Sequence, residues 1–331
     1  MSPTLTPIEQ ALHLQRVEDN LYQASAAQLW LPLNARGVFG GQIIGLSLRA
    51  AVKTVDPKFL VHSLHCYFLL PGDPSIPILL SVKRIRDGRA FATRSVTAIQ
   101  RGKPIFTLTS SFQVQEDSIL SHQYPMPTVP MPEELESHQD IFTRLLTDPN
   151  TPRFAQKNLQ LRLQEPVPIE FRPVRSATSL KDFTRPDKRE PRQLVWMRAR
   201  GKLPDELAIH QCVAAYTSDH YLVNTSLLPH AVTAYSNPQL SMIASLDHAI
   251  WFHAPFRTDD WLLYEMESTR TGSGRGLCFS RVFTREGVLV MSCAQEGVVR
   301  AKYRDSLQKG LKESSSGESK GEGTEEHRSK L

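Results

Sequence analysis

Residues 245–297 read SLDHAIWFHAPFRTDDWLLYEMESTRTGSGRGLCFSRVFTREGVLVMSCAQEG. Leu246, Ile250 and Phe252 recur at a period of two, which is the spacing of one face of a half-buried strand. Further runs rich in β-branched and aromatic residues follow, separated by turns that contain proline or glycine. The stretch therefore predicts a set of antiparallel strands joined by tight turns.

An earlier segment of the chain repeats this pattern. Residues 62–113 read HSLHCYFLLPGDPSIPILLSVKRIRDGRAFATRSVTAIQRGKPIFTLTSSFQ, with strand-like runs and turns in the same order. Pro71 and Pro255 are 184 residues apart, and Gly102 and Gly287 are 185 residues apart. A repeat that holds its register over this length predicts two copies of one supersecondary unit.

A helix-like stretch precedes each copy, at residues 40–55 and at residues 205–223. Strand-like stretches at residues 166–174 and 193–201 come before the second helix. Each half thus reads as strand, helix and four antiparallel strands. A central helix wrapped by a curved antiparallel sheet is the hotdog arrangement, so the sequence predicts an α+β double hotdog.

The domain boundaries follow from this repeat. We expect an N-terminal hotdog over residues 1–115 and a C-terminal hotdog that carries the active site over residues 166–305. Four prolines between residues 125 and 132 exclude a regular helix or central strand there. Residues 116–165 are therefore predicted to be a linker, with a short helix from Pro132 to Thr147. Residues 306–331 are charged and rich in serine and glycine, which predicts a disordered tail.

Composition limits the class of protein. The chain of 331 residues is 40% hydrophobic and 22% charged, as in a soluble globular protein, and no apolar run reaches the roughly 18 residues of a membrane span. The net charge of +5 comes from scattered basic residues without a nucleic-acid-binding motif, so we expect no nucleic-acid partner. The four cysteines are far apart and contain no C-x-x-C pair, which argues against a metal site or a disulfide framework.

The chain ends in Ser329-Lys330-Leu331. A terminal S-K-L is the peroxisomal address, which an import receptor reads at the free carboxylate. The predicted disordered tail would present it to that receptor. The sequence therefore predicts a location in the peroxisome matrix.

Several motifs resemble one enzyme family. GVFGGQIIG, HSLHCYF, PGDP, AAYTSD, SLDHAIWFHAPF, RGL and AQEGVVR occur in order over about residues 15–303 and are similar to those of the acyl-CoA thioesterase II family. The resemblance implies a double hotdog that hydrolyses acyl-CoA without a metal, a cofactor or a covalent intermediate. It also implies that Asp219 in AAYTSD, Ser245 in SLDHAIWFH and Gln295 in AQEGVVR hold and activate a water. Relatives tend to have threonine at the Ser245 position.

The chemistry of these residues fits the implied reaction. Water is the weak partner in thioester hydrolysis, so an oriented base is the main requirement. We expect Asp219 on the apolar stripe of the second central helix, where loss of hydration raises the pKa of a carboxyl group. Asp247 and His248 are expected to form local hydrogen bonds that fix their strand. The helix of the first half has no acid, so we expect one active site in each chain.

Other residues are candidates for substrate binding. Gly40 and Gly41 open the first central helix, whose N–H groups could polarise the thioester oxygen. Lys83, Arg84 and Arg86 could contact the phosphates of coenzyme A, although a solvated hairpin explains them equally well.

Two alternatives to a thioesterase stay open at this stage. One is a non-catalytic acyl-CoA binding protein, and the other is a different hotdog enzyme such as a hydratase, although the hydratase motif N-D-x-N-P-x-H is absent from the sequence. Association into a homo-oligomer also stays open, because members of the resembled family often associate.

Overall fold

One antiparallel sheet runs through the molecule. The computed structural model describes residues 5–303, and within that range thirteen strands pair in the order β1-β2-β4-β5-β6-β3-β10-β13-β12-β11-β8-β7, with β9 added beside β13. The strands are β1 (Gln15–Glu18), β2 (Leu21–Ala24), β3 (Phe59–Phe68), β4 (Ile78–Asp87), β5 (Phe91–Gln100), β6 (Lys103–Val114), β7 (Ile169–Pro173), β8 (Arg192–Ala199), β9 (Gln239–Ser245), β10 (Asp247–Phe252), β11 (Leu262–Gly272), β12 (Arg275–Thr284) and β13 (Leu289–Lys302).

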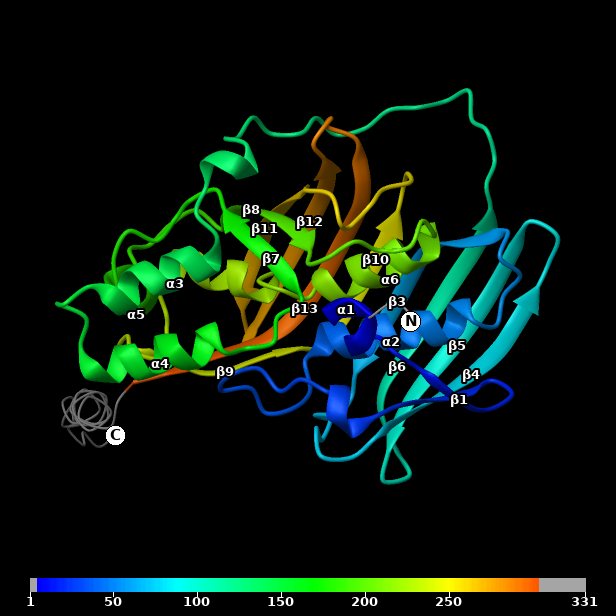
Figure 1. Ribbon diagram of the computed structural model, residues 1–331, viewed down its shortest axis with the longest axis horizontal. Helices are drawn as coiled ribbons and strands as arrows, with labels where there is room; N and C mark the ends of the chain where they lie inside the picture. The colour runs from blue at the N-terminus through cyan, green and yellow to red at the C-terminus, as the bar shows by residue number, and fades with distance from the viewer. Residues whose placement is uncertain (1–4, 304–331) are drawn as a thin grey trace, which may run out of the picture.

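Two helices occupy the centre of the molecule, and the strands of both halves lie around them (Figure 1). These are α2 (Gly40–Val52) and α6 (Leu207–Thr217), whose buried side chains belong to one hydrophobic core. The other helices are α1 (Pro7–Ala11), η1 (Ala26–Gln28), η2 (Pro132–Glu134), α3 (His138–Thr147), α4 (Arg153–Leu163), α5 (Lys181–Thr184) and η3 (Val223–His230). None of the described helices has the length and apolar character needed to cross a membrane.

The two halves join strand to strand. Strand β3 of the first half pairs antiparallel with β10 of the second, with His65 opposite Ala249. The four strands after α2 and the strands β10 to β13 after α6 then follow the same order, as the repeat predicted. The double hotdog fold is thereby confirmed.

The repeat extends to the pairing register. In the first half Arg94 of β5 pairs with Ser110 of β6. In the second half Cys278 of β12 pairs with Gln295 of β13. These positions are related by the offset of the two proline and glycine turns, so each residue of one half has an identifiable counterpart in the other.

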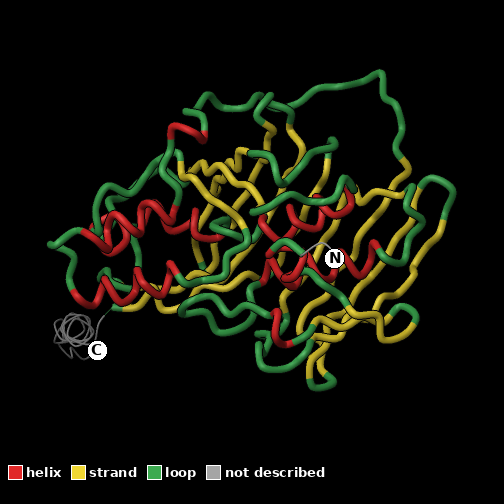
Figure 2. The backbone as a smooth tube through the Cα atoms, viewed as in Figure 1, coloured by secondary structure: helices red, strands yellow, loops and turns green. Residues whose placement is uncertain are grey.

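The linker between the halves is extended first and helical afterwards (Figure 2). The predicted short helix from Pro132 to Thr147 is two elements, η2 and α3, and a further helix, α4, follows that the proline-rich composition did not indicate. Helix α3 begins after Ser137, whose hydroxyl accepts from the N–H of Asp140 while the carboxylate of Asp140 accepts from the N–H of Ser137.

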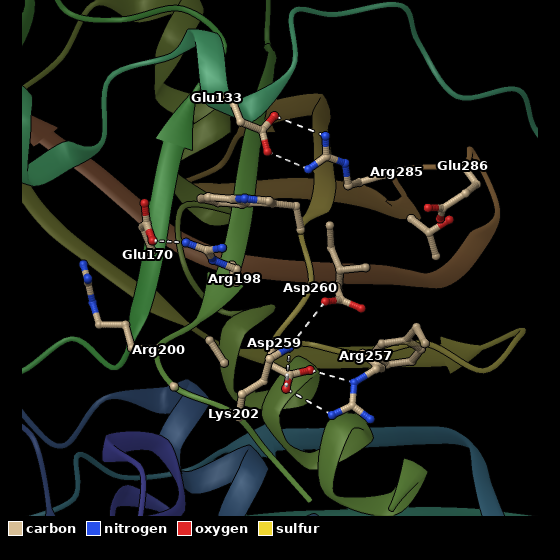
Figure 3. A pocket seen from close by; sticks show the side chains of 16 residues that line it. Glu133, Glu170, Arg198, Arg200, Lys202, Arg257, Asp259, Asp260, Arg285 and Glu286 are labelled. Carbon is tan, nitrogen blue, oxygen red and sulfur yellow. Dashed lines mark hydrogen bonds and ion pairs between the residues drawn. The ribbon is translucent and has the colours of Figure 1, made fainter. Parts of the chain in front are cut away.

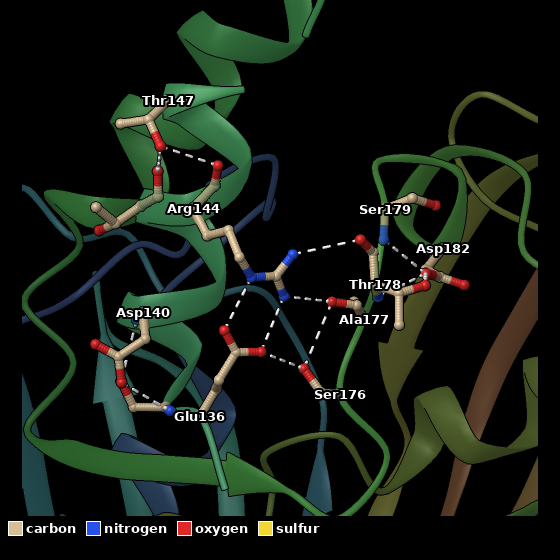
Figure 4. A network of polar contacts seen from close by, with 11 residues as sticks. Glu136, Asp140, Arg144, Thr147, Ser176, Ala177, Thr178, Ser179 and Asp182 are labelled. Carbon is tan, nitrogen blue, oxygen red and sulfur yellow. Dashed lines mark hydrogen bonds and ion pairs between the residues drawn. The ribbon is translucent and has the colours of Figure 1, made fainter. Parts of the chain in front are cut away.

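One ion pair fastens this helical segment to the second half (Figure 4). The guanidinium of Arg144 on α3 donates twice to Glu136, with both distances at 2.9 Å. It also donates to the carbonyl oxygens of Ala177 and Thr178, which lie just after β7. The segment therefore packs beside α5 and β7 rather than hanging free.

Two expected boundaries differ in the structure. The second central helix was expected to continue to residue 223, but α6 ends at Thr217 and leaves Asp219 beyond its end. The opening strand of residues 245–253 is divided, because Ser245 ends β9 and Asp247 begins β10. Both differences lie beside the candidate site, where the backbone turns to aim polar side chains inward.

Candidate functional site

Asp219 lies at the centre of a hydrogen-bond cluster formed by both halves. Its Oδ1 accepts from the hydroxyl of Ser245 at 3.0 Å and from Nε2 of Gln295 at 2.5 Å. Its Oδ2 accepts from the backbone N–H of Gly41 at 2.8 Å. The structure thus brings the three residues suggested by the motifs into direct contact, and it adds Gly41 of the first half.

The strands set the positions of Ser245 and Gln295. Ser245 at the end of β9 pairs with Gly297 of β13, which places it two residues along from Gln295. Nε2 of Gln295 also donates to the Ser245 hydroxyl at 2.9 Å. Both amide protons of Gln295 are therefore used within the cluster.

The carboxyl group of Asp219 is a stronger base than an ordinary aspartate. Burial raises its pKa from 3.8 to about 6, against the lowering effect of the hydrogen bonds from Gln295, Ser245 and Gly41. Asp219 is still mostly ionised at neutral pH, because its pKa lies below 7. The raised pKa agrees with the expectation from sequence, but the expected position on the helix stripe was wrong, since the residue follows the end of α6.

Glycine at the start of α2 lets the two halves approach closely. A Cβ on Gly40 would lie 2.6 Å from Oδ2 of Asp219, and a Cβ on Gly41 would lie 2.1 Å from the carbonyl oxygen of Tyr216. The N–H of Gly41 is bonded to Asp219, whereas no hydrogen bond of the described residues uses the N–H of Gly40. Only the N–H of Gly40 is thus open to a ligand.

An aromatic wall follows Asp219. The ring of His220 lies 4.4 Å from that of Phe39 and 4.9 Å from that of Phe171, centroid to centroid. The hydroxyl of Tyr221 lies 3.0 Å from Nδ1 of His138 on α3. Sequence reasoning missed this wall, because its rings come from segments that are far apart in the chain and share no motif.

Lys83, Arg84 and Arg86 lie on β4, away from this cluster. The carbonyl oxygen of Arg86 accepts from the guanidinium of Arg94, which also donates to Thr54 just beyond the C-terminal end of α2. Gly40 and Gly41 are at the opposite end of this helix, and 13 residues of helix span about 20 Å. The structure does not bring the three cations together with Asp219.

The counterpart of the site in the first half is closed by Arg94. This side chain is 1% exposed and takes the place that Cys278 holds beside Gln295. Its guanidinium donates to the hydroxyl and carbonyl oxygens of Thr54 at 2.9 and 3.0 Å. A cation hydrogen-bonded to a threonine thus fills the position where the second half holds its carboxylate.

A cavity of about 790 Å³ opens elsewhere in the second half and does not include Asp219 (Figure 3). Its charged side chains largely pair with one another, as Glu133 does with Arg285, Glu170 with Arg198, and Asp259 with Arg257. Within residues 5–303 we find no group of three or more histidine, cysteine, aspartate or glutamate side chains arranged to hold a metal ion. The Asp219 cluster is therefore the best candidate site.

Two family models match the chain. One described as acyl-CoA thioesterase matches residues 168–298, and one described as acyl-CoA thioesterase N-terminal domain matches residues 28–113.

Named relatives match over most of the chain. It is 44% identical to acyl-coenzyme A thioesterase 8 of Mus musculus over 296 residues, which are 89% of both chains. It is 28% identical to the peroxisomal acyl-coenzyme A thioester hydrolase 1 of Saccharomyces cerevisiae over 313 residues, covering 81% of this chain and 87% of that protein.

A solved structure matches as well. The acyl-CoA thioesterase II TesB2 of Mycobacterium marinum is similar with a TM-score of 0.67 at 35% identity, covering 90% of this chain and 99% of that one.

Proposed function

The chain belongs to the acyl-CoA thioesterase II family and is an acyl-CoA thioesterase, and we propose that Asp219, Ser245 and Gln295 form its active site. In this proposal a water activated by Asp219 attacks the thioester directly. One observation carries it: a single carboxylate of raised pKa is bonded to a hydroxyl, an amide and a helix N-terminus at once.

Asp219 acts as the general base. Its Oδ2 has one donor, Gly41, so a second lone pair can accept a proton from water. As that proton moves to the carboxylate, the water oxygen bonds to the thioester carbon. Ser245 and Gln295 hold the carboxylate in place and stabilise its negative charge before the proton arrives.

The N–H of Gly40 stabilises the developing oxyanion. It is the first N–H of α2, it has no partner among the described residues, and a helix N-terminus carries a partial positive charge. The tetrahedral intermediate then breaks the carbon–sulfur bond. Coenzyme A leaves as a thiolate that takes up a proton, and the fatty acid leaves as a carboxylate.

The C-terminal tripeptide gives the location. We assign the enzyme to the peroxisome matrix, imported by the receptor for Ser329-Lys330-Leu331 and acting in fatty-acid metabolism. The name of the yeast relative supports this assignment. The tripeptide lies outside the described residues.

Release of free thiol from a panel of acyl-CoAs tests the proposed site. We expect Asp219→Asn to lower kcat by about 100-fold to 10,000-fold, the usual contribution of a general base. Asp260→Asn is the matched control, because that carboxylate is exposed and contacts only Lys202 at 3.9 Å. Thermal unfolding would show that both variants fold.

The other outcomes separate the alternatives. Full turnover by Asp219→Asn would discard this site and keep the enzyme class. Binding of acyl-CoA by the wild type without turnover of any substrate would favour the non-catalytic binding protein.

A further inference from the structure

Two buried polar atoms beside the candidate site have no hydrogen-bond partner among the described residues. They are Nδ1 of His248 and Oε1 of Gln295. The side chain of His248 is 1% exposed and that of Gln295 is 0% exposed, so no solvent replaces the missing partners. Because buried polar groups are nearly always paired, two complementary atoms left open in one place need a common explanation.

The two side chains are neighbours across adjacent strands. Ala249 of β10 pairs with Ala294 of β13, which puts His248 beside Gln295 on the inner face of the sheet. Gln295 also raises the pKa of His248, against the larger lowering effect of burial, which requires the amide to lie close to the imidazole. The two open atoms thus face the same small space.

The distribution of protons decides how they can pair. Gln295 uses both amide protons on Asp219 and Ser245, so Oε1 can only accept. Burial lowers the pKa of His248 to about 3, so the ring is neutral and carries one proton. Its Nε2 lies 3.0 Å from the hydroxyl of Ser218, which can either donate or accept. A proton on Nδ1 is therefore the arrangement that satisfies every atom.

We propose that His248 is a positioning residue for the reaction: its Nδ1–H donates to Oε1 of Gln295, while the Ser218 hydroxyl donates to Nε2. The inference rests on the proposed active site. It fixes the Gln295 amide with its nitrogen on Asp219 and Ser245. The reversed amide would set its NH2 group against the Nδ1–H of His248 and its oxygen against the carboxylate of Asp219.

Ser218 links this arrangement to the base itself. It is the residue that caps α6 and directly precedes Asp219, and its side chain is 0% exposed. In the structure its hydroxyl oxygen is also 3.0 Å from the carbonyl oxygen of Ala215, the competing acceptor for its single proton. The proposal therefore requires that this proton points to His248 and not to Ala215.

Two substitutions of His248 separate positioning from packing. An asparagine amide nitrogen lies near the place of Nδ1, whereas a glutamine amide nitrogen lies near the place of Nε2. We expect His248→Gln to lower kcat by about 10-fold to 100-fold with KM changed by less than about threefold. We expect His248→Asn to stay within about threefold of the wild-type kcat, because it keeps the donor to Gln295. Equal kcat values for the two variants would overturn the proposal.

The tautomer gives a readout that needs neither turnover nor a variant that keeps its activity. Nitrogen-15 NMR of histidine-labelled wild type, with the His248 signal identified by its loss in His248→Asn, shows which ring nitrogen carries the proton. A proton on Nδ1 is expected, and a proton on Nε2 would overturn the proposal.

Asp219→Asn, measured beside these variants, separates the two proposals. If it is inactive while both His248 variants match the wild type, only the role of His248 fails. If it retains full activity, the active site fails first.

Discussion

Asp219 combines two demands on a single side chain. A base for water must have a raised pKa, and burial supplies it, yet a buried carboxylate needs hydrogen bonds that lower the pKa again. Three donors from three different segments, at Gly41, Ser245 and Gln295, set the balance at about 6. The residue is therefore both held in place and basic enough to accept a proton near neutral pH.

The acid limb of the pH profile should report this group. A general base works only when deprotonated, so kcat/KM should fall below a pH of about 6 and be constant above about 7. The neighbouring His220 and His248, each with a pKa lowered by burial to about 3, do not change charge in that range. Thiol release measured over about pH 4.5 to 8.5, with an acyl-CoA whose spontaneous hydrolysis is subtracted, checks it. Constant kcat/KM down to a pH of about 4.5 would contradict it.

The close approach at Gly40 gives a second prediction. A methyl group there would meet Oδ2 of Asp219 at 2.6 Å and Cε1 of Phe68 at 2.9 Å. We expect Gly40→Ala to displace the carboxylate and reduce kcat by about 100-fold, as small misplacements of reacting groups do.

Gly272→Ala is the control for that substitution, because its nearest neighbour would be Nε of Arg270 at an ordinary 3.6 Å. Thiol-release assays of both variants, together with their melting temperatures, check the prediction. If Gly40→Ala kept the kcat of the control, the carboxylate would not need this approach.

At the scale of elements, the sequence predicted what repeats and missed what depends on contacts between distant segments. The four-strand pattern, its turns and both central helices follow from periodicity and turn residues that occur twice. The end of α6 at Thr217 does not, because the apolar pattern continues into Tyr221 and Leu222. The bond from Gly41 to Asp219 joins residues 178 positions apart, and no local pattern encodes it.

The site shows the same division. Asp219, Ser245 and Gln295 came from motifs, because a motif preserves residue types at fixed spacing. The interpretation of Lys83, Arg84 and Arg86 came from charge alone, and charge does not say which end of α2 a strand lies against. The placement of these residues needed the register of β4 with β5.

Strand β5 carries the next prediction. Arg94 donates to Thr54, to the carbonyl oxygen of Arg86 at 3.0 Å and to Asp87 at 2.5 Å. We expect Arg94→Met to leave these buried acceptors without a donor and to lower the free energy of unfolding by about 2–4 kcal/mol. The kcat of the folded variant should be unchanged, since Arg94 lies at the far end of α2 from Asp219.

Urea unfolding followed by circular dichroism measures this effect. Arg101→Met is the matched control, because that guanidinium is exposed and its ion pair with Asp73 should contribute less than about 1 kcal/mol. Equal midpoints for the two variants would show that the buried hydrogen bonds of Arg94 contribute no net stability.

At the scale of the whole molecule, the two halves share one sheet, one core and one candidate site. The β3–β10 pairing carries the sheet across the boundary, and α2 approaches α6 so closely that a Cβ at Gly45 would lie 3.2 Å from the carbonyl oxygen of Cys212. The base comes from the second half and one of its donors from the first. Neither half alone can assemble the cluster, which explains why a first half without catalytic residues is retained in the fold.

This architecture predicts a single unfolding transition. Because the halves share their core, urea unfolding curves from circular dichroism and from tryptophan fluorescence should coincide. Three of the four tryptophans, Trp196, Trp251 and Trp261, lie in the second half, so fluorescence reports mainly on that half. Leu108→Ala, a substitution in the core of the first half at a side chain 1% exposed, should lower stability by about 2–5 kcal/mol. In one cooperative unit it must shift the fluorescence curve as far as Val282→Ala-type changes in the second half would, in proportion to their own cost. A fluorescence transition that Leu108→Ala leaves in place would mean that the halves unfold separately, and the bond between Gly41 and Asp219 would then join two independent domains.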